Sequence, residues 1–165
     1  MKNCLITISL FLALLTSCEK ALPKKIEDPK FVKVWYDTCQ GMPFSSKLKI
    51  GVNKKFEYYS RACQDGSRSN GYWRIVNDTI ILNSIKPKGC LYQYPFGVVC
   101  DIFNEPEIVD NTTIKNCDPD GREATYEIFE NEKFFIRNDT LIHLEKRNAA
   151  CSQYRIAFSS KEKIR

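Results

Sequence analysis

The residues with the most distinctive chemistry in this sequence are its eight cysteines. Six of them lie beyond residue 30, namely Cys39, Cys63, Cys90, Cys100, Cys117 and Cys151. An even number of cysteines in an exported domain is typical of a disulfide framework, although the sequence cannot choose among their pairings. The alternative is a zinc site, but no two cysteines have the Cys-x-x-Cys spacing and the chain has one histidine. We therefore predict disulfides, with no metal site and no cofactor.

His143 is that single imidazole, so any histidine-dependent catalysis would require it. It could instead contact a ligand or sense pH, and a hydrogen-bonded core histidine is the structural alternative. A group of carboxylates could form an acid/base pair or hold calcium: Asp101, Glu105, Glu107 and Asp110. They lack the pattern of a calcium loop, and no nucleophile elbow, phosphate loop or zinc-protease motif occurs. We therefore predict no catalytic residues, with a hydrolase as the enzymatic alternative.

Cys18 follows shortly after an apolar run from Leu5 to Leu15, which itself follows a positively charged start. The run has the length of a secretory signal and is too short to cross a bilayer as a helix. Its end, Leu15-Thr16-Ser17-Cys18, resembles the lipobox of bacterial lipoproteins. In that family the signal is cut just before the cysteine, which carries a diacylglycerol. The resemblance implies that residues 1–17 are a lipoprotein signal peptide and that Cys18 is the lipidated first residue. A chance cysteine after an ordinary signal is the alternative.

The rest of the chain divides into a tether at residues 18–30 and a single domain at residues 31–160. The tether is charged, contains two prolines and has no apolar period. Glu19 follows the cysteine, where some bacteria use aspartate to keep lipoproteins in the inner membrane. We therefore expect the outer membrane, on either its periplasmic or its surface face. The net charge of +5 comes from scattered residues, so no nucleic-acid partner is expected.

Short β-branched and aromatic runs, separated by turn residues, predict an all-β domain. Ten strands are expected, near 31–36, 46–51, 54–61, 71–76, 79–84, 97–103, 124–130, 133–137, 140–145 and 153–158. The close spacing indicates an antiparallel meander of about eight to ten strands that closes as a β-barrel or packs as a sandwich. A disulfide-rich loop region, residues 85–123, interrupts it.

One hairpin pattern occurs twice, around Asn77-Asp78-Thr79 and Asn138-Asp139-Thr140. Asn and Asp tolerate the positive φ angles of a two-residue turn. Pairing outward from the first turn places Val76 opposite Thr79 and Trp73 opposite Leu82. The inward-facing residues are then predicted to be Trp73, Ile75, Ile80 and Leu82, with Phe134, Ile136, Leu141 and His143 in the second copy. Either an old duplication or chance similarity would explain the repeat.

Aromatic residues also gather on the neighbouring strands: Phe56, Tyr58, Tyr59, Tyr72 and Trp73. They could stack on a sugar or an apolar ligand, or could simply fill the core. Alternation along the strand places Phe56 and Tyr58 on one face and Tyr59 on the other.

Residues 48–84 are similar to uncharacterised lipocalin-like lipoproteins of Bacteroidetes-type bacteria. The shared features are the aromatic strand at 56–59, the glycines Gly66 and Gly71, Trp73, and Asp78-Thr79. The resemblance implies a small β-barrel on a lipid anchor, and the cysteine-rich middle departs from it. The triplets at Thr79 and Thr140 resemble O-glycosylation sites of the same bacteria, and turn chemistry is the alternative explanation.

Two functions follow as expectations. The first is an envelope lipoprotein, held in the membrane through Cys18, whose barrel binds a small apolar ligand or a glycan beside Trp73, Phe134 and His143. The second is an assembly module that contacts another envelope protein through loops 85–123. The second would show a filled core and an exposed apolar patch on those loops.

Overall fold

The computed structural model describes residues 28–38, 44–62, 65–97, 111–121, 124–144 and 156–162. The regular secondary structure of these residues consists of β-strands. None of the described residues forms a helix that is long and apolar enough to cross a membrane. The strands are β1 Val34–Asp37, β2 Phe44–Ile50, β3 Lys55–Ala62, β4 Asp65–Val76, β5 Thr79–Ser84, β6 Tyr92–Pro95, β7 Thr125–Ile128, β8 Glu132–Arg137, β9 Thr140–Leu144 and β10 Ala157–Ser159. The all-β prediction is confirmed.

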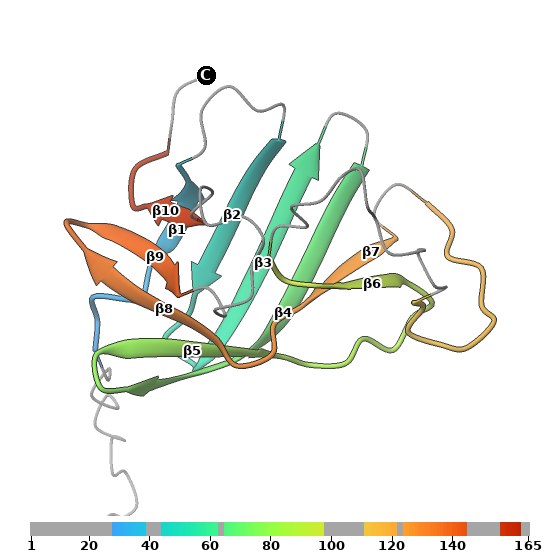
Figure 1. The fold of residues 1–165 in the computed structure, drawn as a ribbon, viewed down its shortest axis with the longest axis horizontal. Coiled ribbons are helices and arrows are strands. Elements are labelled where there is room, and N and C mark those ends of the chain that lie inside the picture. The colour runs from blue at the N-terminus through green and yellow to red at the C-terminus, as the bar shows by residue number, and fades with distance from the viewer. Residues whose placement is uncertain are drawn as a thin grey trace, which may run out of the picture.

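Most of the strands close into an antiparallel barrel (Figure 1). Their order around it is β3-β2-β1-β10-β9-β8-β5-β4, and β3 pairs with β4 to complete the ring. Of the two forms predicted for the meander, the barrel is therefore confirmed. Closure removes the unpaired edges that an open sheet would expose.

Two strands, β6 and β7, branch from the barrel wall. β5 pairs with β4 only between Gly71 and Val76, because β5 ends at Ser84. β7 pairs in parallel with the remaining part of β4, at Ser67 and Arg68, and β6 pairs in parallel with β7. Figure 1 shows both strands beside β4, away from β8 and β9. These parallel pairs depart from the predicted antiparallel meander.

β6 is absent from the sequence prediction, because the polar Gln93 and the proline Pro95 weaken its strand pattern. Pro95 is tolerated because β6 lies at the edge of the sheet, where one side of its backbone needs no strand partner. The strand predicted at 97–103 lies, beyond Gly97, outside the described residues.

Two other strand starts were predicted wrongly. The first strand begins at Val34, and not at Phe31, because Phe31 and Val32 donate backbone hydrogen bonds to Asp28 and Pro29 in a turn. β4 begins at Asp65, six residues before its predicted start, because it pairs with β3 along the whole of that strand. Its first half is rich in polar residues and therefore lacks the usual signal of a strand.

Both Asn-Asp hairpin turns are confirmed. Asn77 and Asp78 have φ angles of 45° and 63°, and Asn138 and Asp139 have 49° and 56°. Positive φ at both central residues is the geometry that Asn and Asp favour in such turns. β5 pairs with β8, so the two similar hairpins lie side by side in the barrel wall.

The predicted register and inner face of the first hairpin are also confirmed. Val76 lies opposite Thr79, and Trp73 lies opposite Leu82. The predicted inner residues are buried or pack against the core: Trp73, Ile75, Ile80, Leu82, Phe134, Ile136, Leu141 and His143. Outward-facing Arg74 is exposed.

The N-terminal segment covers one end of the barrel. Phe31 and Trp35 are fully buried, and the Trp35 indole N–H donates a hydrogen bond to the Phe31 carbonyl at 2.9 Å. Lys30 and Lys33 form ion pairs with the aspartates of the two hairpin turns, at 2.6 and 3.6 Å. We call this the closed end of the barrel, and the opposite end, where β3 ends and β4 begins, the far end.

Candidate ligand-binding site

Polar side chains line the inner face of the barrel toward the far end. Ser46, Ser60 and Ser67 lie opposite one another on β2, β3 and β4. Asp37 continues this line on β1, where its carboxylate accepts a hydrogen bond from the Ser46 N–H at 2.6 Å. Ser46 stands two residues before the buried Leu48 and therefore faces the interior. We call Asp37, Ser46, Ser60 and Ser67 the polar row.

Glu127 of β7 adds a carboxyl group beside the polar row. The Ser67 hydroxyl donates a hydrogen bond to Glu127 Oε1. Glu127 is half-buried, and it forms no ion pair with any lysine, arginine or histidine of the described residues. Burial without a neighbouring positive charge raises the pKa of the Glu127 carboxyl, and the hydrogen bond from Ser67 opposes this shift.

Tyr58 connects the polar row to the core. Its hydroxyl donates to Ser46 Oγ at 3.3 Å, and Ser46 Oγ donates to Ser60 Oγ at 3.2 Å. Burial, reinforced by the negative charge of Glu127, raises the pKa of the Tyr58 phenol. The phenol therefore stays neutral and available as a hydrogen-bond donor.

Three aromatic rings form a layer at the level of Tyr58. Phe129, which follows β7, packs edge-on to Tyr58 with ring centroids 5.3 Å apart. Phe96, which follows β6, stacks on Phe129 at 4.0 Å and meets Tyr58 edge-on at 5.5 Å. The branch strands β6 and β7 thus supply two of the three rings, and we call Tyr58, Phe96 and Phe129 the aromatic layer.

His143 and Glu132 form a second polar group inside the barrel. His143 Nε2 lies 2.7 Å from Glu132 Oε2, and both side chains are only 5% exposed. The rings of Phe96 and Phe134 lie 5.3 and 4.9 Å from the imidazole. His143 therefore has the hydrogen-bonded core environment that the sequence offers as its structural alternative. Its Nδ1 atom is buried and has no hydrogen-bond partner among the described residues.

The structure buries all three residues that the sequence predicts to line a ligand. Phe134 and His143 are in contact. Trp73 belongs to the same core cluster, but its indole N–H donates to the Gly51 carbonyl at 2.9 Å, in the turn after β2. The ammonium group of Lys54 lies 4.2 Å from the centre of the Trp73 ring. Trp73 is therefore fixed near the closed end, away from the polar row.

The predicted faces of the aromatic strand are confirmed. Phe56 and Tyr58 are buried, whereas Tyr59 is 37% exposed. Tyr72 is 54% exposed and points outward from β4, so it does not join the interior cluster. Core filling accounts for Phe56, and only Tyr58 of this group reaches the polar row.

Several predicted residues lie outside the described residues. These are Cys18, Cys39, Cys63, Cys100, Cys151, Asp101, Glu105, Glu107 and Asp110. The threonines considered for glycosylation are described. Thr79 and Thr140 donate hydrogen bonds to the carbonyls of Asn77 and Asn138, at 3.4 and 3.3 Å. Both threonines thus take part in the turn chemistry that is the alternative to glycosylation.

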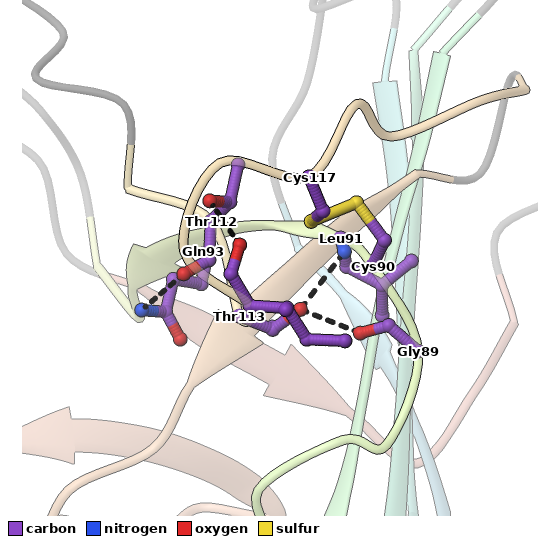
Figure 2. Close-up of a disulfide and its surroundings, with 8 residues drawn as sticks. Gly89, Cys90, Leu91, Gln93, Thr112, Thr113 and Cys117 are labelled. Carbon is purple, nitrogen blue, oxygen red and sulfur yellow. Dashed lines mark hydrogen bonds between the residues drawn. A yellow bond between two sulfur atoms is a disulfide. The ribbon is translucent and has the colours of Figure 1, made fainter.

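A disulfide joins Cys90 to Cys117, two of the six candidate cysteines whose pairing the sequence leaves open (Figure 2). The buried Thr113 holds the same loop, because its hydroxyl donates to the Gly89 carbonyl at 2.5 Å and accepts from the Leu91 N–H at 2.9 Å. Leu91 leads directly into β6. The bridge therefore fixes the segment that carries Phe96 into the core.

The sequence gives weak signals for three residues of this interior. Glu127 and Phe129 are two residues apart and therefore share one face of the strand, whereas Tyr126 and Ile128 share the other. Both faces carry large apolar side chains, so alternation alone cannot assign the inner face. Tyr126 is buried on that other face because its hydroxyl donates to the carbonyls of Asn70 and Ile85.

Glu132 and Phe96 are missed for different reasons. Glu132 falls one residue before the predicted start of its strand, although it is two residues from Phe134 and therefore lies on the same face. Phe96 follows the strand that the prediction lacks, so no sequence pattern places its ring in the core.

Comparison with known proteins gives no match. No family model, no curated protein and no solved structure is significantly similar to this chain. The chemistry of the interior is therefore the basis on which its function has to be inferred.

Proposed function

We propose that this protein is a lipid-anchored, non-enzymatic binding protein of the bacterial cell envelope. Its barrel holds a small ligand that carries polar groups and is either an otherwise apolar molecule or a glycan. The supporting observation is the division of the inner face. The closed end is filled by apolar side chains such as Phe31 and Leu141, whereas the polar row and Glu127 occupy the inner face toward the far end.

This division favours ligand binding because a barrel interior needs no carboxyl groups for stability. Burying a polar group costs free energy unless it is hydrogen-bonded, and burying a carboxylate costs more. Apolar side chains in place of Ser60, Ser67 and Glu127 would fill the same space without that free-energy cost. A polar lining is useful when a molecule with polar groups enters, because it then supplies the missing hydrogen bonds.

The anchor part of the proposal depends on the lipobox around Cys18. Two or three acyl chains on one residue would hold the barrel on a membrane, since each buried methylene contributes about 0.8 kcal/mol. We expect the N-terminal peptide of the protein, isolated from membranes, to begin at Cys18 and to carry a diacylglycerol. Replacement of the cysteine in Cys18→Ala should prevent both cleavage and lipidation. A soluble, cleaved Cys18→Ala protein would contradict the anchor.

Native mass spectrometry tests ligand binding. The full chain would be expressed with its own leader in a bacterium with an oxidising periplasm, then extracted from membranes in a mild detergent. We expect a bound species that is present in the native spectrum and absent after denaturation. Identical native and denatured masses, together with no response to pools of envelope lipids and sugars, would contradict the ligand.

A second candidate is the assembly module, favoured by two exposed isoleucines of the region 85–123, on either side of the disulfide-held loop's start. Ile85 is 40% exposed and Ile114 is 48% exposed. Exposed apolar side chains on a rigid loop are typical of a contact surface. Crosslinking in intact cells, with a photoreactive residue at Ile114 and a control at the exposed Arg74, would test it. A specific adduct at Ile114 alone supports this candidate, and equal labelling at both positions argues against it.

A further inference from the structure

We propose that the interior ligand is a small organic cation, whose ammonium group pairs with Glu127 and whose carbon skeleton packs on the aromatic layer. This inference rests on the proposed ligand-binding function and adds the charge of the ligand. It follows from three observations: a carboxylate without a cation, hydroxyl groups around it, and aromatic rings beside it.

Glu127 provides the charge. Its carboxylate faces the barrel interior beside Ser67, and no cationic side chain of the described residues pairs with it. The side chain is only half-buried, so part of its surface stays accessible. Of the other interior carboxylates, Glu132 is bonded to His143, and Asp37 accepts a hydrogen bond from the Ser46 N–H. Glu127 is thus the acidic group whose strongest partner has yet to be supplied.

The surroundings suit an ammonium group. An alkylammonium has up to three N–H donors, and Glu127 Oε2 can accept one of them. The hydroxyl oxygens of Ser60 and Ser67 belong to the same polar row and can accept others. An anionic ligand is disfavoured, because it would meet Glu127 and Asp37 at close range.

The aromatic layer suits the rest of such a ligand. Tyr58 and Phe129 come from β3 and from the end of β7, and Phe129 lies two residues after Glu127, on the same face of the chain. Aromatic faces attract cations through their negative quadrupole and pack against carbon skeletons. A carboxylate next to aromatic rings therefore favours an organic cation over a metal ion.

Isothermal titration with matched probes tests the charge. The full chain, purified from membranes, would be titrated with phenethylammonium and with 2-phenylethanol, which share a skeleton and differ in the charged group. We expect phenethylammonium to bind about tenfold more tightly than the alcohol, as the pairing of one ammonium with one carboxylate would give. The preference should disappear in Glu127→Gln, which keeps the shape and removes the charge.

Two further variants make the result specific. Glu130→Gln removes the same charge from an exposed position three residues away, and should bind as wild type. Glu127→Asp keeps the charge and should retain the preference for the ammonium probe, which decides the matter if Glu127→Gln does not fold. Equal affinities for the two probes, an unchanged preference in Glu127→Gln, or no binding of phenethylammonium at millimolar concentration would each overturn the proposal.

The failure of this inference is distinguishable from failure of the proposed function. A neutral molecule carried by the protein in native mass spectrometry, and still carried by Glu127→Gln, would overturn the cation while leaving ligand binding in place. Absence of any bound small molecule, combined with no response to the probes, would remove both.

Discussion

Two glutamates enter the barrel interior, and their surroundings give them different roles. Glu132 is buried against His143, so its charge has a local partner in the core. Glu127 accepts a hydrogen bond from the Ser67 hydroxyl and forms no ion pair with a cationic side chain of the described residues. A buried acid that is hydrogen-bonded to an imidazole has a structural role, whereas a partly buried carboxylate without a positively charged partner lowers stability unless something binds it.

The first prediction concerns the stability cost of Glu127. Its folded-state pKa lies above the ordinary value of 4.5, so the folded protein binds more protons than the unfolded chain between those two values. The free energy of unfolding should therefore fall as the pH rises through this window. Glu127→Gln lacks this titration and should be more stable than wild type by about 1 kcal/mol at about pH 8, and no more stable at about pH 4. Urea unfolding at both pH values measures this, and a constant difference would contradict it.

The second prediction concerns the His143–Glu132 pair. Removing either partner leaves a polar group buried with less compensation, so His143→Leu and Glu132→Leu should each lower the free energy of unfolding by about 3 kcal/mol. The double variant should lose less than the sum of the two, because it removes both polar groups together. Denaturant unfolding of the four proteins completes the cycle, with Glu130→Leu as an exposed control. Strictly additive losses would show that the pair is not coupled.

At the scale of the elements, the position of β7 decides what the barrel interior contains. β5 ends at Ser84, and β7 takes its place as the neighbour of β4 toward the far end, at Ser67 and Arg68. The chain then continues from Phe129 into β8, back in the barrel wall. One segment thus contributes Glu127 and Phe129 to the interior before it becomes a wall strand, and this explains why a polar group and an aromatic ring lie so close together.

The third prediction tests the hairpin turns. Asn77 has a positive φ of 45°, which a β-branched residue adopts only at a cost. Asn77→Val should therefore lower the free energy of unfolding by about 1 to 2 kcal/mol. Arg74→Val, on the exposed face of the same hairpin, should have little effect, because valine favours a strand. Thermal and urea unfolding of both variants would show the difference. Equal losses would mean that the turn conformation does not matter.

At the scale of the whole molecule, the sequence predicts the repeated and apolar parts of the fold but not the branch. The hairpins at Asn77 and Asn138 could be predicted because turn residues and alternation act over short distances. The same pattern indicates a meander but leaves open whether it closes as a barrel or packs as a sandwich. The branch could not be predicted, because β6 and β7 pair in parallel through contacts between Tyr92 and Thr125, which are distant in sequence. The candidate site depends on those contacts, so the sequence names only Tyr58 of the site itself, among the aromatic residues, with Phe134 and His143 of its surroundings.

The wall of the barrel and the branch differ in what holds them. The eight wall strands form a closed ring of backbone hydrogen bonds, covered at one end by Phe31. Among the described strands β6 neighbours only β7, and beyond it the Cys90–Cys117 bridge and the hydrogen bonds of Thr113 hold the segment. The wall should therefore persist when the branch loosens.

The fourth prediction tests this independence with Cys90→Ala/Cys117→Ala. The bridge spans a sequence separation of 27 residues, and a loop of that length contributes roughly 3 to 4 kcal/mol in the chain-entropy account. Since the loss falls on the branch, hydrogen exchange should quicken at Tyr92 to Tyr94 and stay slow at the closed end, for example at Ile80. Loss of order at β6 would also release Phe96 from the aromatic layer. Uniformly faster exchange across the barrel would instead show that branch and wall unfold as one unit, and unchanged exchange at β6 would show that the bridge is dispensable.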